Sequence, residues 1–564
     1  MSDRHFSSWP PKVPHELPLP ETSLWYNLEV SATRYPNKRA TVFYDSVLGY
    51  AELRRHAEQL AAYLQHECGV QRGDRIALYM QNCPQFIVGF YAALRADAMV
   101  VPVNPMNLGT ELAYILEDSG AKAILIAQDL LPNLTPLLRD SRALPALSRA
   151  VVTAYSDYLT EPTTLFVPEF LRTPLAPLDV PRSIAWRDAR ALDLSPALHR
   201  AGPDDLCVLP YTSGTTGHPK GCVHTHRSVM HTTLASPSWH RNSPNETSLS
   251  VLPLFHVTGM QNCMNAPIYA GGTMVVMSRW DRDAAAELIQ RYRVTNWTSV
   301  PTMVVDLLSS PSIGLYDLSS LQTVGGGGAA MPEAIAQRLE QLTGLAYLEG
   351  YGLSETMAAT HINPVQNPKK QCLGIPIFGV DSRVVNPDTL QELGPEEVGE
   401  IITHGPQLFQ GYWNKPEANG ECFVTIDGKR FFRTGDLGRV DAEGYFFLVD
   451  RIKRMINAAG FKVWPAEVES MLYAHPAIKE AAIIAQRHPR RGETVKAVVA
   501  LKQGQALTEE ELVAWARTQM AAYKVPRSVE FVEALPKNAS GKIMWRTLQE
   551  LEDKRMQAAK ADAG

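Results

Sequence analysis

The sequence predicts an α/β protein, and three features of its hydrophobic pattern support that prediction. Short apolar runs alternate with helical patterns at 74–127 and again at 271–301. Between about 375 and 449, short alternating segments separated by Gly, Pro and Asp take over, and a small mixture of helices and strands follows. The first pattern is typical of parallel strands joined by right-handed crossovers, and the second of antiparallel strands.

The first alternation starts with a run typical of a buried strand. The whole alternation predicts a strand at 74–80, a helix at 84–98, a strand at 99–105, a helix at 110–120 and a strand at 122–127. The order β-α-β-α-β indicates a parallel sheet. Residues 129–201 follow without clear periodicity and contain many Pro and Leu, so we expect an irregular surface insertion there.

The second alternation, at 271–301, has the order strand, helix, strand. The segments from about 375 to 449 predict a small β-barrel or sheet, and the tail predicts a small α+β unit. A charged join at Asp450 and Arg451 indicates an exposed linker. We therefore predict an N-terminal domain at 1–449 and a C-terminal domain at 450–564.

Composition narrows the class of protein. The net charge of −5 gives no reason to expect nucleic acid as a partner. Seven scattered cysteines without a C-x-x-C pair suit a reducing, cytoplasmic location better than a disulfide framework. The polar, Pro-rich N-terminus and the lack of a long apolar run predict neither a signal peptide nor a transmembrane helix. Peripheral membrane contact and a homodimer remain open.

The stretch YTSGTTGHPKG, at 211–221, resembles a nucleotide-binding loop with two departures. In the frame G-x-x-x-x-G-K-[ST], Pro219 stands for the second Gly and Gly221 for the Ser or Thr that would bind magnesium. Its hydroxyls, its backbone N–H groups and Lys220 are suited to an anion. Alone, the stretch is equally compatible with a flexible polar loop.

Three later segments add candidates for the same chemistry. In YLEGYGLSET (347–356), Tyr351 offers an aromatic face for a base, and Glu355 offers a carboxylate for Mg²⁺. Asp436 lies in FRTGDLG, where its oxygens suit two ribose hydroxyls, and Lys542 ends the loop PKNASGK. Taken singly, these segments also fit a Gly-rich turn, an Asx-turn and a solvated loop.

Together and in this order, the motifs resemble the adenylate-forming superfamily, which comprises acyl-CoA synthetases, adenylation domains of peptide synthetases and luciferases. The resemblance runs from YPNKRATVFYDSVLGYAEL (35–53) to GKIMWRTL (541–548). Within the superfamily the chain looks most like bacterial medium- and long-chain fatty acyl-CoA ligases. The resemblance implies a large domain of stacked, mostly parallel sheets with a β-barrel, and a small mobile C-terminal domain hinged at Asp450.

The resemblance also implies residue roles. The phosphate loop would hold ATP through Thr212, Ser213, Gly214, Thr215, Thr216, Gly217 and Lys220. The adenine side would be formed by Tyr351 with Glu349, Gly350 and Gly352, and by the segment GGGGAAMPE (325–333) with Gly328, which also walls the acyl pocket. Thr356 would contact the α-phosphate and Glu355 would bind Mg²⁺. Asp436 would contact the ribose, Arg451 would contact the ribose or a phosphate, and Lys542 would serve adenylation.

The implied reaction has two steps. Attack of a carboxylate on the α-phosphate of ATP gives an acyl-adenylate and pyrophosphate, and cations must offset the repulsion between these anions. CoA then takes the acyl group after the C-terminal domain has rotated and brought up the segment 457–469. There, Gly460 would let the backbone approach the pantetheine channel.

The acid itself is less well defined by the sequence. The segment 255–272 should border an apolar acyl tunnel with Met260, Met264 and Ala266, although plain core packing would read the same way. His256 matches a position beside the acyl carboxylate, and the alternative is a buried strand-end histidine. Four clustered histidines, His218, His224, His226 and His231, lack the spacing of a zinc site.

Four other functions are compatible with parts of this pattern. An aryl- or short-chain acyl-CoA ligase would use the same machinery with a shallower pocket. A stand-alone amino-acid adenylating enzyme would need an Asp near 254–258, where this chain reads LFHVT. A luciferase-like oxidation needs a special luciferin, and a nucleotide-binding regulator would not need Lys542.

Overall fold

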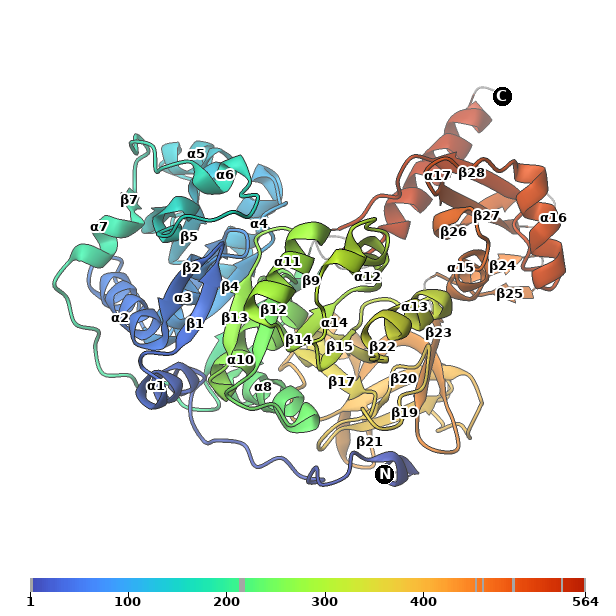
Figure 1. Cartoon of the computed structure of the whole chain (residues 1–564), viewed down its shortest axis with the longest axis horizontal. Helices are drawn as coiled ribbons and strands as arrows, with labels where there is room; N and C mark the ends of the chain where they lie inside the picture. The colour runs from blue at the N-terminus through green and yellow to red at the C-terminus, as the bar shows by residue number, and fades with distance from the viewer. Residues whose placement is uncertain are drawn as a thin grey trace.

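The computed structural model describes residues 4–212, 219–451, 454–458, 461–488, 492–538 and 541–561. Four sheets of five or more strands, two of them large and parallel-rich, form the framework, so the predicted α/β class is confirmed. In Figure 1 the two large sheets and their helices occupy the left and centre, the antiparallel sheet lies below on the right, and the C-terminal part lies above it.

The seven-stranded sheet has the order β11-β8-β4-β3-β5-β6-β7. Its strands are β3 (Arg75–Tyr79), β4 (Met99–Val103), β5 (Ala123–Ala127), β6 (Arg149–Thr153), β7 (Ser183–Ala185), β8 (Leu206–Val208) and β11 (His224–Thr225). The helices α3 (Pro84–Arg95) and α4 (Gly109–Ser119) connect the first three strands, which are parallel. The predicted alternation at 74–127 is therefore confirmed.

The expected irregular insertion at 129–201 is wrong. This stretch contains β6 and β7, which pair in parallel and extend the sheet, and the helices α5 (Leu131–Arg139), α6 (Glu169–Arg172) and α7 (Trp186–Ala191). The apolar run of β6 is short, and Pro-rich connections surround it, so neither period stands out in the sequence.

The nine-stranded sheet has the order β18-β17-β16-β15-β14-β12-β13-β1-β2. Its strands are β1 (Arg39–Phe43), β2 (Ser46–Gly49), β12 (Thr247–Ser250), β13 (Thr273–Val276), β14 (Asn296–Ser299), β15 (Thr323–Gly326), β16 (Tyr347–Leu353), β17 (Ala358–Ile362) and β18 (Ile375–Pro376). With α11 (Arg282–Tyr292) between β13 and β14, the predicted alternation at 271–301 is confirmed.

One large core joins the two big sheets. It contains Val42 and Val275 from the nine-stranded sheet and Leu78 and Val100 from the seven-stranded sheet, all fully buried. The helices associated with the sheets are α1 (Trp25–Arg34), α2 (Tyr50–His66), α8 (His226–His240), α9 (Val257–Met260), α10 (Ala266–Ala270), α12 (Pro301–Leu308) and α13 (Glu333–Thr343). A π-helical turn, η4 (Gln261–Asn265), connects α9 to α10.

The region predicted as a small barrel forms an antiparallel five-stranded sheet. It consists of β19 (Asp381–Val385), β20 (Gly399–His404), β21 (Phe423–Ile426), β22 (Lys429–Val440) and β23 (Phe446–Arg451), with α14 (Pro416–Cys422) before β21. The long strand β22 pairs with three neighbours, and its register shifts at Leu437/Gly438. This sheet ends at Arg451, one residue after the predicted hinge.

The C-terminal part has its own five-stranded sheet. Its elements are β24 (Ile456–Ala458), β25 (Phe461–Val463), α15 (Pro465–Leu472), β26 (Ile478–His488), β27 (Gly492–Leu501), α16 (Glu509–Gln519), β28 (Ser528–Val532) and α17 (Trp545–Ala561). The Lys496 ammonium pairs with Glu552 of α17 at 2.7 Å and with Glu530 at 2.8 Å, which ties the last helix to the sheet. The domain boundary at 450 stays a prediction.

Asp450 connects these two antiparallel regions. Its buried carboxylate accepts hydrogen bonds from the backbone N–H of Arg451 at 2.6 Å and of Ala466 at 2.8 Å. Ala466 lies in the first turn of α15, where N–H groups lack helical partners. One carboxylate thus holds the end of β23 against the start of α15.

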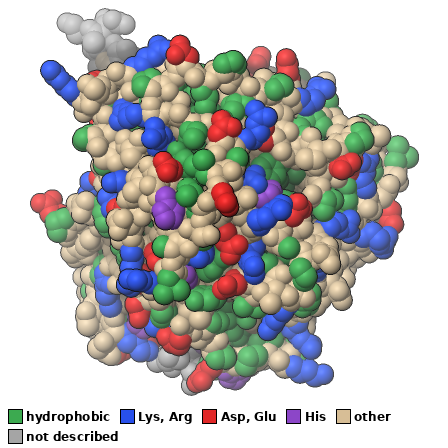
Figure 2. Space-filling model, turned by 90° about the vertical axis from the view of Figure 1, so that its left-hand side faces the viewer, with side chains coloured by type: hydrophobic (Ala, Val, Ile, Leu, Met, Phe, Trp, Pro, Cys, Tyr) green, Lys and Arg blue, Asp and Glu red, His purple; other side chains and the backbone are tan. Residues whose placement is uncertain are grey.

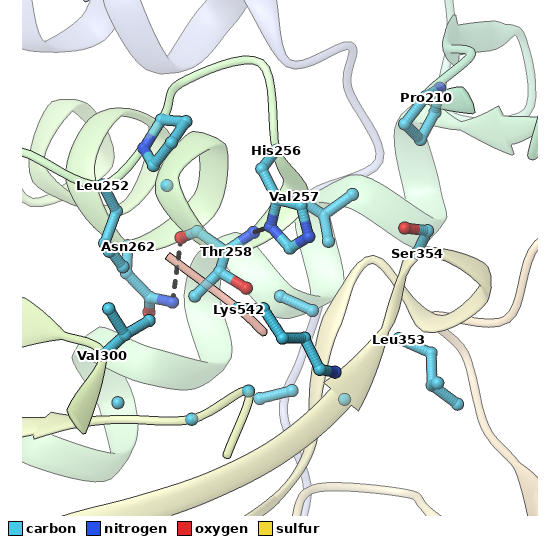
Figure 3. A pocket seen from close by; sticks show the side chains of 18 of the residues that line it. Pro210, Leu252, His256, Val257, Thr258, Asn262, Val300, Leu353, Ser354 and Lys542 are labelled. Atoms are coloured by element: carbon cyan, nitrogen blue, oxygen red, sulfur yellow. Dashed lines mark hydrogen bonds between the residues drawn. The ribbon is translucent and has the colours of Figure 1, made fainter. Parts of the chain in front are cut away.

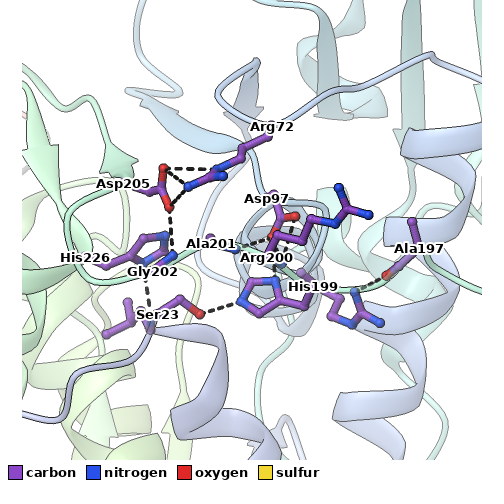
Figure 4. A network of polar contacts seen from close by, with 12 residues as sticks. Ser23, Arg72, Asp97, Ala197, His199, Arg200, Ala201, Gly202, Asp205 and His226 are labelled. Carbon is purple, nitrogen blue, oxygen red and sulfur yellow. Dashed lines mark hydrogen bonds and ion pairs between the residues drawn. The ribbon is translucent and has the colours of Figure 1, made fainter.

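A second buried polar network joins distant parts of the chain (Figure 4). Ser23 Oγ lies 2.6 Å from His199 Nε2, and His199 Nδ1 lies 2.6 Å from Asp97 Oδ1. The Asp97 carboxylate also accepts hydrogen bonds from the N–H groups of Arg200 and Ala201. The network connects three places in the fold: the segment before α1, the loop between α7 and β8, and the residues that follow α3.

Within the described residues, no helix is long and apolar enough to cross a membrane. Figure 2 shows acidic and basic side chains interspersed with apolar ones on one face, without a continuous patch of one sign. Peripheral membrane contact, a homodimer and a cytoplasmic location stay predictions.

Candidate active site

A cavity of about 1290 Å³ gathers most of the described residues that the sequence selected. Its wall is formed by strands of the nine-stranded sheet, the helical stretch from Val257 to Ala270, the antiparallel sheet and the C-terminal part. The predicted residues on the wall are Thr212, Lys220, His256, Gly328, Gly350, Tyr351, Gly352, Glu355, Arg451 and Lys542. Ser213, Gly214, Thr215, Thr216, Gly217 and Gly460 lie outside the described residues.

Lys542 enters the cavity from the C-terminal part. Figure 3 shows its side chain extending beneath His256 and Thr258, with Leu353 and Ser354 on the other side. Burial, followed by the charge of Arg451, lowers the pKa of its ammonium from 10.5 to about 8. Gly541 makes this entry possible, because its φ is +78° and a Cβ there would lie 3.1 Å from Thr302 Oγ1.

His256 is a neutral imidazole opposite this lysine. Burial and then the Lys542 charge lower the pKa of His256 to about 4. Its Nδ1 accepts the backbone N–H of Thr258 at 3.3 Å and so caps the short helix α9. The cap orients the ring, and the ring adds no positive charge at neutral pH.

Tyr351, Asp436 and Arg451 form a connected group. The Tyr351 hydroxyl donates to Asp436 Oδ2 at 2.6 Å, and Arg451 Nε lies 2.8 Å from Asp436 Oδ1. Asp436 and Arg451 face each other across β22 and β23, which explains the second contact. Asp436 is buried behind Tyr351 and Arg451 and does not itself line the cavity. Its predicted ribose contact stays a prediction.

Glu355 presents the carboxylate that Mg²⁺ would need. It follows β16 in a single turn, lines the cavity, and accepts the Tyr412 hydroxyl on Oε1 at 2.8 Å. Burial raises the pKa of Glu355. No cluster of three or more His, Cys, Asp or Glu suited to a metal occurs among the described residues. One carboxylate that leaves the other positions to phosphate and water is a usual arrangement for Mg²⁺, so the donor set fits.

Thr356 does not line the cavity, and its expected contact with the α-phosphate stays a prediction. It is fully buried, and its hydroxyl accepts the Leu353 N–H at 2.9 Å and donates to the Ala358 carbonyl at 2.8 Å. Ser354, two residues earlier, lines the cavity instead (Figure 3). The sequence showed hydroxyls on both sides of Glu355, but it did not show which of them turns inward.

Glu349 likewise lies behind the wall. Its buried carboxylate accepts the N–H of Met331 at 2.8 Å and that of Cys372 at 3.1 Å, and burial raises its pKa to about 7. The bond to Met331 fixes the end of the glycine-rich turn that carries Gly328. In that turn a Cβ on Gly327 would lie 2.3 Å from the Gly350 carbonyl oxygen, so the backbones can meet only without side chains.

The two ends of the phosphate loop lie side by side. Thr212 and Lys220 are register partners in a two-residue antiparallel ladder between β9 (Tyr211–Thr212) and β10 (Lys220–Gly221). The Lys220 ammonium lies 5.0 Å from the centroid of the Tyr412 ring. Both residues line the cavity, so the described parts of the loop face the predicted site.

Comparison with known proteins identifies the family. Residues 28–413 match the family model described as AMP-binding enzyme, and residues 467–542 match its C-terminal domain. The chain belongs to the AMP-binding enzyme family. The resemblance to adenylate-forming enzymes that the motifs indicated is thereby confirmed.

Individual relatives cover nearly the whole chain. A long-chain-fatty-acid–CoA ligase of Bacillus subtilis (strain 168) is 37% identical over 559 residues, 97% of each chain. A feruloyl-CoA synthase of Amycolatopsis sp is 35% identical over 520 residues, 90% of this chain and 95% of that one. The crystal structure of ATP-bound MatB from Rhodopseudomonas palustris is similar with a TM-score of 0.82 at 28% identity, covering 95% of this chain and 99% of that one.

The cavity wall along the helical stretch from Val257 to Ala270 differs from the expected acyl tunnel of this AMP-binding enzyme. Ala266 lines it, but Met260 and Met264 are fully buried in the main core. Two residues four positions apart share one face of a helix, and here that face packs inward. The opposite face, with Gly259 and Asn262, forms the cavity wall.

Three of the clustered histidines of the enzyme bind backbone groups. His224 Nε2 lies 2.7 Å from the Ser354 carbonyl, His231 Nε2 lies 2.9 Å from the Phe378 carbonyl, and His226 Nδ1 accepts the Leu24 N–H at 3.1 Å. All three are buried. His218 lies outside the described residues.

Proposed function

We propose that this AMP-binding enzyme activates a fatty acid with ATP and transfers the acyl group to CoA. One observation carries the proposal. Lys542 of the C-terminal part enters the same cavity as Lys220 and Glu355 of the N-terminal part, with Arg451 at the end of β23 between them. A nucleotide-binding regulator has no need of a lysine brought in from a second domain.

The first step joins two anions. A carboxylate oxygen of the acid attacks the α-phosphorus of ATP, and the bond from that phosphorus to the pyrophosphate oxygen breaks. Lys220 and Lys542 supply positive charge where these groups meet. Phosphate oxygens near Lys542 favour its charged form, which counters the effect of burial. Mg²⁺, which Glu355 would hold, supplies further positive charge to the phosphates.

The second step forms the thioester. The CoA sulfur, as thiolate, attacks the acyl carbonyl, and AMP leaves with the electrons of the carbonyl–oxygen bond. For this step we propose that the C-terminal part turns about Asp450 and withdraws Lys542. The Asp450 carboxylate holds α15 in the present orientation through the Ala466 N–H, so turning exchanges that bond for another.

The shape of the acyl half supports a chain rather than a ring. Its wall follows one face of the continuous helical stretch from Thr258 to Ala270, which is roughly 18 Å long at 1.5 Å per residue. That stretch contains no charged side chain, so nothing in it would pair with the amino group of an amino acid. A benzoate-sized ring would fill a fraction of this length.

The test is pyrophosphate release by the purified chain with ATP, Mg²⁺ and a panel of acids. We expect saturated acids between C6 and C18 to give the highest kcat/KM and acyl-CoA to form when CoA is added. The panel includes benzoate, ferulate and amino acids. Turnover of ferulate or benzoate with no turnover of any alkyl acid would contradict this proposal and favour an aryl-CoA ligase. The panel includes ferulate because one relative is a feruloyl-CoA synthase.

A further inference from the structure

A short segment of the antiparallel region hydrogen-bonds to the strand that follows the phosphate loop. This clamp segment, Gly411–Lys415 (GYWNK), connects β20 to α14. The Trp413 N–H donates to the Gly221 carbonyl at 2.8 Å, and the Val223 N–H donates to the Gly411 carbonyl at 3.0 Å. Tyr412 forms an isolated antiparallel bridge with Cys222 between these bonds. The clamp segment therefore pairs with the strand that leaves the loop.

Tyr412 is the member of the clamp segment that faces the cavity. Its hydroxyl donates to Glu355 Oε1 at 2.8 Å, and its ring lies 5.0 Å below the Lys220 ammonium. One side chain thus contacts the carboxylate that would hold Mg²⁺ and the cation of the phosphate loop. The proposed reaction needs both groups on the same triphosphate.

Tyr412 is itself held firmly. Asn419 accepts the Tyr412 N–H on Oδ1 at 2.6 Å and donates from Nδ2 to the Tyr412 carbonyl at 3.0 Å. The ring packs edge-on against Phe409, with centroids 5.0 Å apart. The Phe409 N–H in turn donates to the Glu355 carbonyl at 2.9 Å, so the carboxylate and its hydrogen-bond donor rest on the same support.

The other end of the loop is fastened to the same segment through Asp118 of α4. The Asp118 carboxylate accepts the Tyr211 hydroxyl at 2.7 Å and the Lys415 ammonium at 2.9 Å. Trp413 Nε1 donates to the Asp118 carbonyl at 3.0 Å. Residues on both sides of the loop are thereby connected to the clamp segment.

We propose that Tyr412 is a positioning residue that fixes Lys220 relative to Glu355, and that Asp118 with Lys415 fixes the clamp segment that carries it. The inference rests on the proposed function, because it concerns the binding of magnesium and ATP. Preset groups act on developing charge without reorganising during the reaction, which is where such a residue contributes. Its loss should weaken metal and nucleotide binding and leave the recognition of the acid unchanged.

Tyr412→Phe tests the hydroxyl alone, since the ring and its contact with Lys220 remain. We expect Mn²⁺ affinity, measured by electron paramagnetic resonance with ATP and without acid, to fall about 10-fold, in the range seen when a group that supports a metal ligand is removed. The KM for Mg²⁺ in pyrophosphate release should rise similarly, and the KM for the acid should stay within twofold.

Two further variants separate positioning from mere packing. Tyr445→Phe is the matched control, because it removes a hydroxyl that donates to the Asn367 carbonyl at 2.7 Å away from the cavity, and it should leave both readouts unchanged. Asp118→Asn should raise the KM for ATP and leave the affinity for Mn²⁺ less affected than Tyr412→Phe does. In a double-mutant cycle, Tyr412→Phe should add little to the Mn²⁺ loss of Glu355→Gln, because the two side chains act through one contact.

Unchanged Mn²⁺ affinity in a folded Tyr412→Phe, or full additivity with Glu355→Gln, overturns the inference. The proposed function fails in a different way. If the wild type binds Mn²⁺ with ATP, and Tyr412→Phe weakens that binding, but no acid in the panel releases pyrophosphate, the reaction is wrong and the role of Tyr412 stands.

Discussion

Two groups of polar residues in this chain each contain a histidine, and they differ in how their members are paired and in whether a cavity reaches them. Ser23, His199 and Asp97 are connected by two contacts of 2.6 Å, in the order of a serine hydrolase triad. His256 and Lys542 share the cavity without a hydrogen bond between them. By residue type alone, the first group would be chosen as the catalytic one.

Access and pairing reverse that choice. Ser23 is fully buried, and none of its group lines the large cavity. The Lys542 ammonium, in contrast, has no hydrogen-bond or ion-pair partner in the described part of the chain and points into open space (Figure 3). A lysine on the wall of a cavity, with its ammonium free to meet a ligand, is a candidate for the reacting site. The hydrogen-bonded Ser23 network stabilises the fold, whereas Lys542, an unpaired group on the cavity wall, indicates the candidate active site.

The largest expected effect tests the unpaired lysine. Lys542→Ala should slow adenylate formation by about 10³-fold, the scale on which removal of a preset charge at a reacting centre acts. Conversion of supplied acyl-adenylate and CoA to the thioester should remain within a few-fold, because the lysine is withdrawn for that step. Separate assays of pyrophosphate exchange and of thioester formation measure the two steps. An equal loss in both would contradict the role assigned to Lys542.

The pH dependence of the first step sharpens the same point. The pKa of Lys542 is lowered to about 8, so its charge is present below that pH and is lost as the pH rises through it. We expect kcat/KM for pyrophosphate release to fall about tenfold per pH unit above that value, since kcat/KM reports the free enzyme. In Lys542→Arg, where the guanidinium stays charged, the normalised profile should remain flat to pH 10. The same fall in the arginine variant would assign it to another group.

The comparison also applies to two hydroxyls that flank Glu355. Ser354 faces the cavity, so Ser354→Ala should slow adenylate formation about tenfold with little change in stability. Thr356 closes a buried turn, so Thr356→Val should lower the free energy of unfolding by about 1–3 kcal/mol, because the Leu353 N–H loses its acceptor. Urea unfolding and initial rates on both variants decide. A reversed pattern would restore Thr356 to the reacting centre.

We expect the smallest effect on activity from the buried network of Ser23, His199 and Asp97. Ser23→Ala leaves the His199 ring without one partner, which should lower the free energy of unfolding by about 1–3 kcal/mol. The kcat/KM at 25 °C should stay within twofold of the wild type. Loss of activity in a variant that remains folded at that temperature would mean that this region takes part in the reaction after all.

Sequence reasoning succeeded where the signal is local or where a motif defines a position. The strands predicted at 74–80 and 99–105 contain short apolar runs, and the motifs selected Lys220, Glu355, Arg451 and Lys542, which line one cavity. It failed where the answer depends on side-chain direction. Residue identity does not show that Met260 and Met264 face the core, or that Ser354 rather than Thr356 faces the cavity.

The sequence gives no sign of the position of Tyr412 for a related reason. Its partner Glu355 is 57 residues away, and a tyrosine in GYWNK has no chemical signature of its own. The strands β6 and β7 were missed because short runs between prolines resemble loops. In these cases the information lies in tertiary contacts, which a pattern along the chain does not contain.

The close seating of Gly541 against Thr302 and Val300 has a consequence for how the intermediate survives. An acyl-adenylate is a mixed anhydride that water cleaves readily. Under the proposed reaction, this anhydride forms only while Gly541 packs against Val300 and Thr302 and Lys542 lines the cavity. The C-terminal part would then both shield the intermediate from water and supply Lys542 to the reaction that forms it. A larger side chain at position 541 would keep the C-terminal part from packing closely and would let water reach the acyl-adenylate. The enzyme would then release AMP and free acid steadily in the absence of CoA.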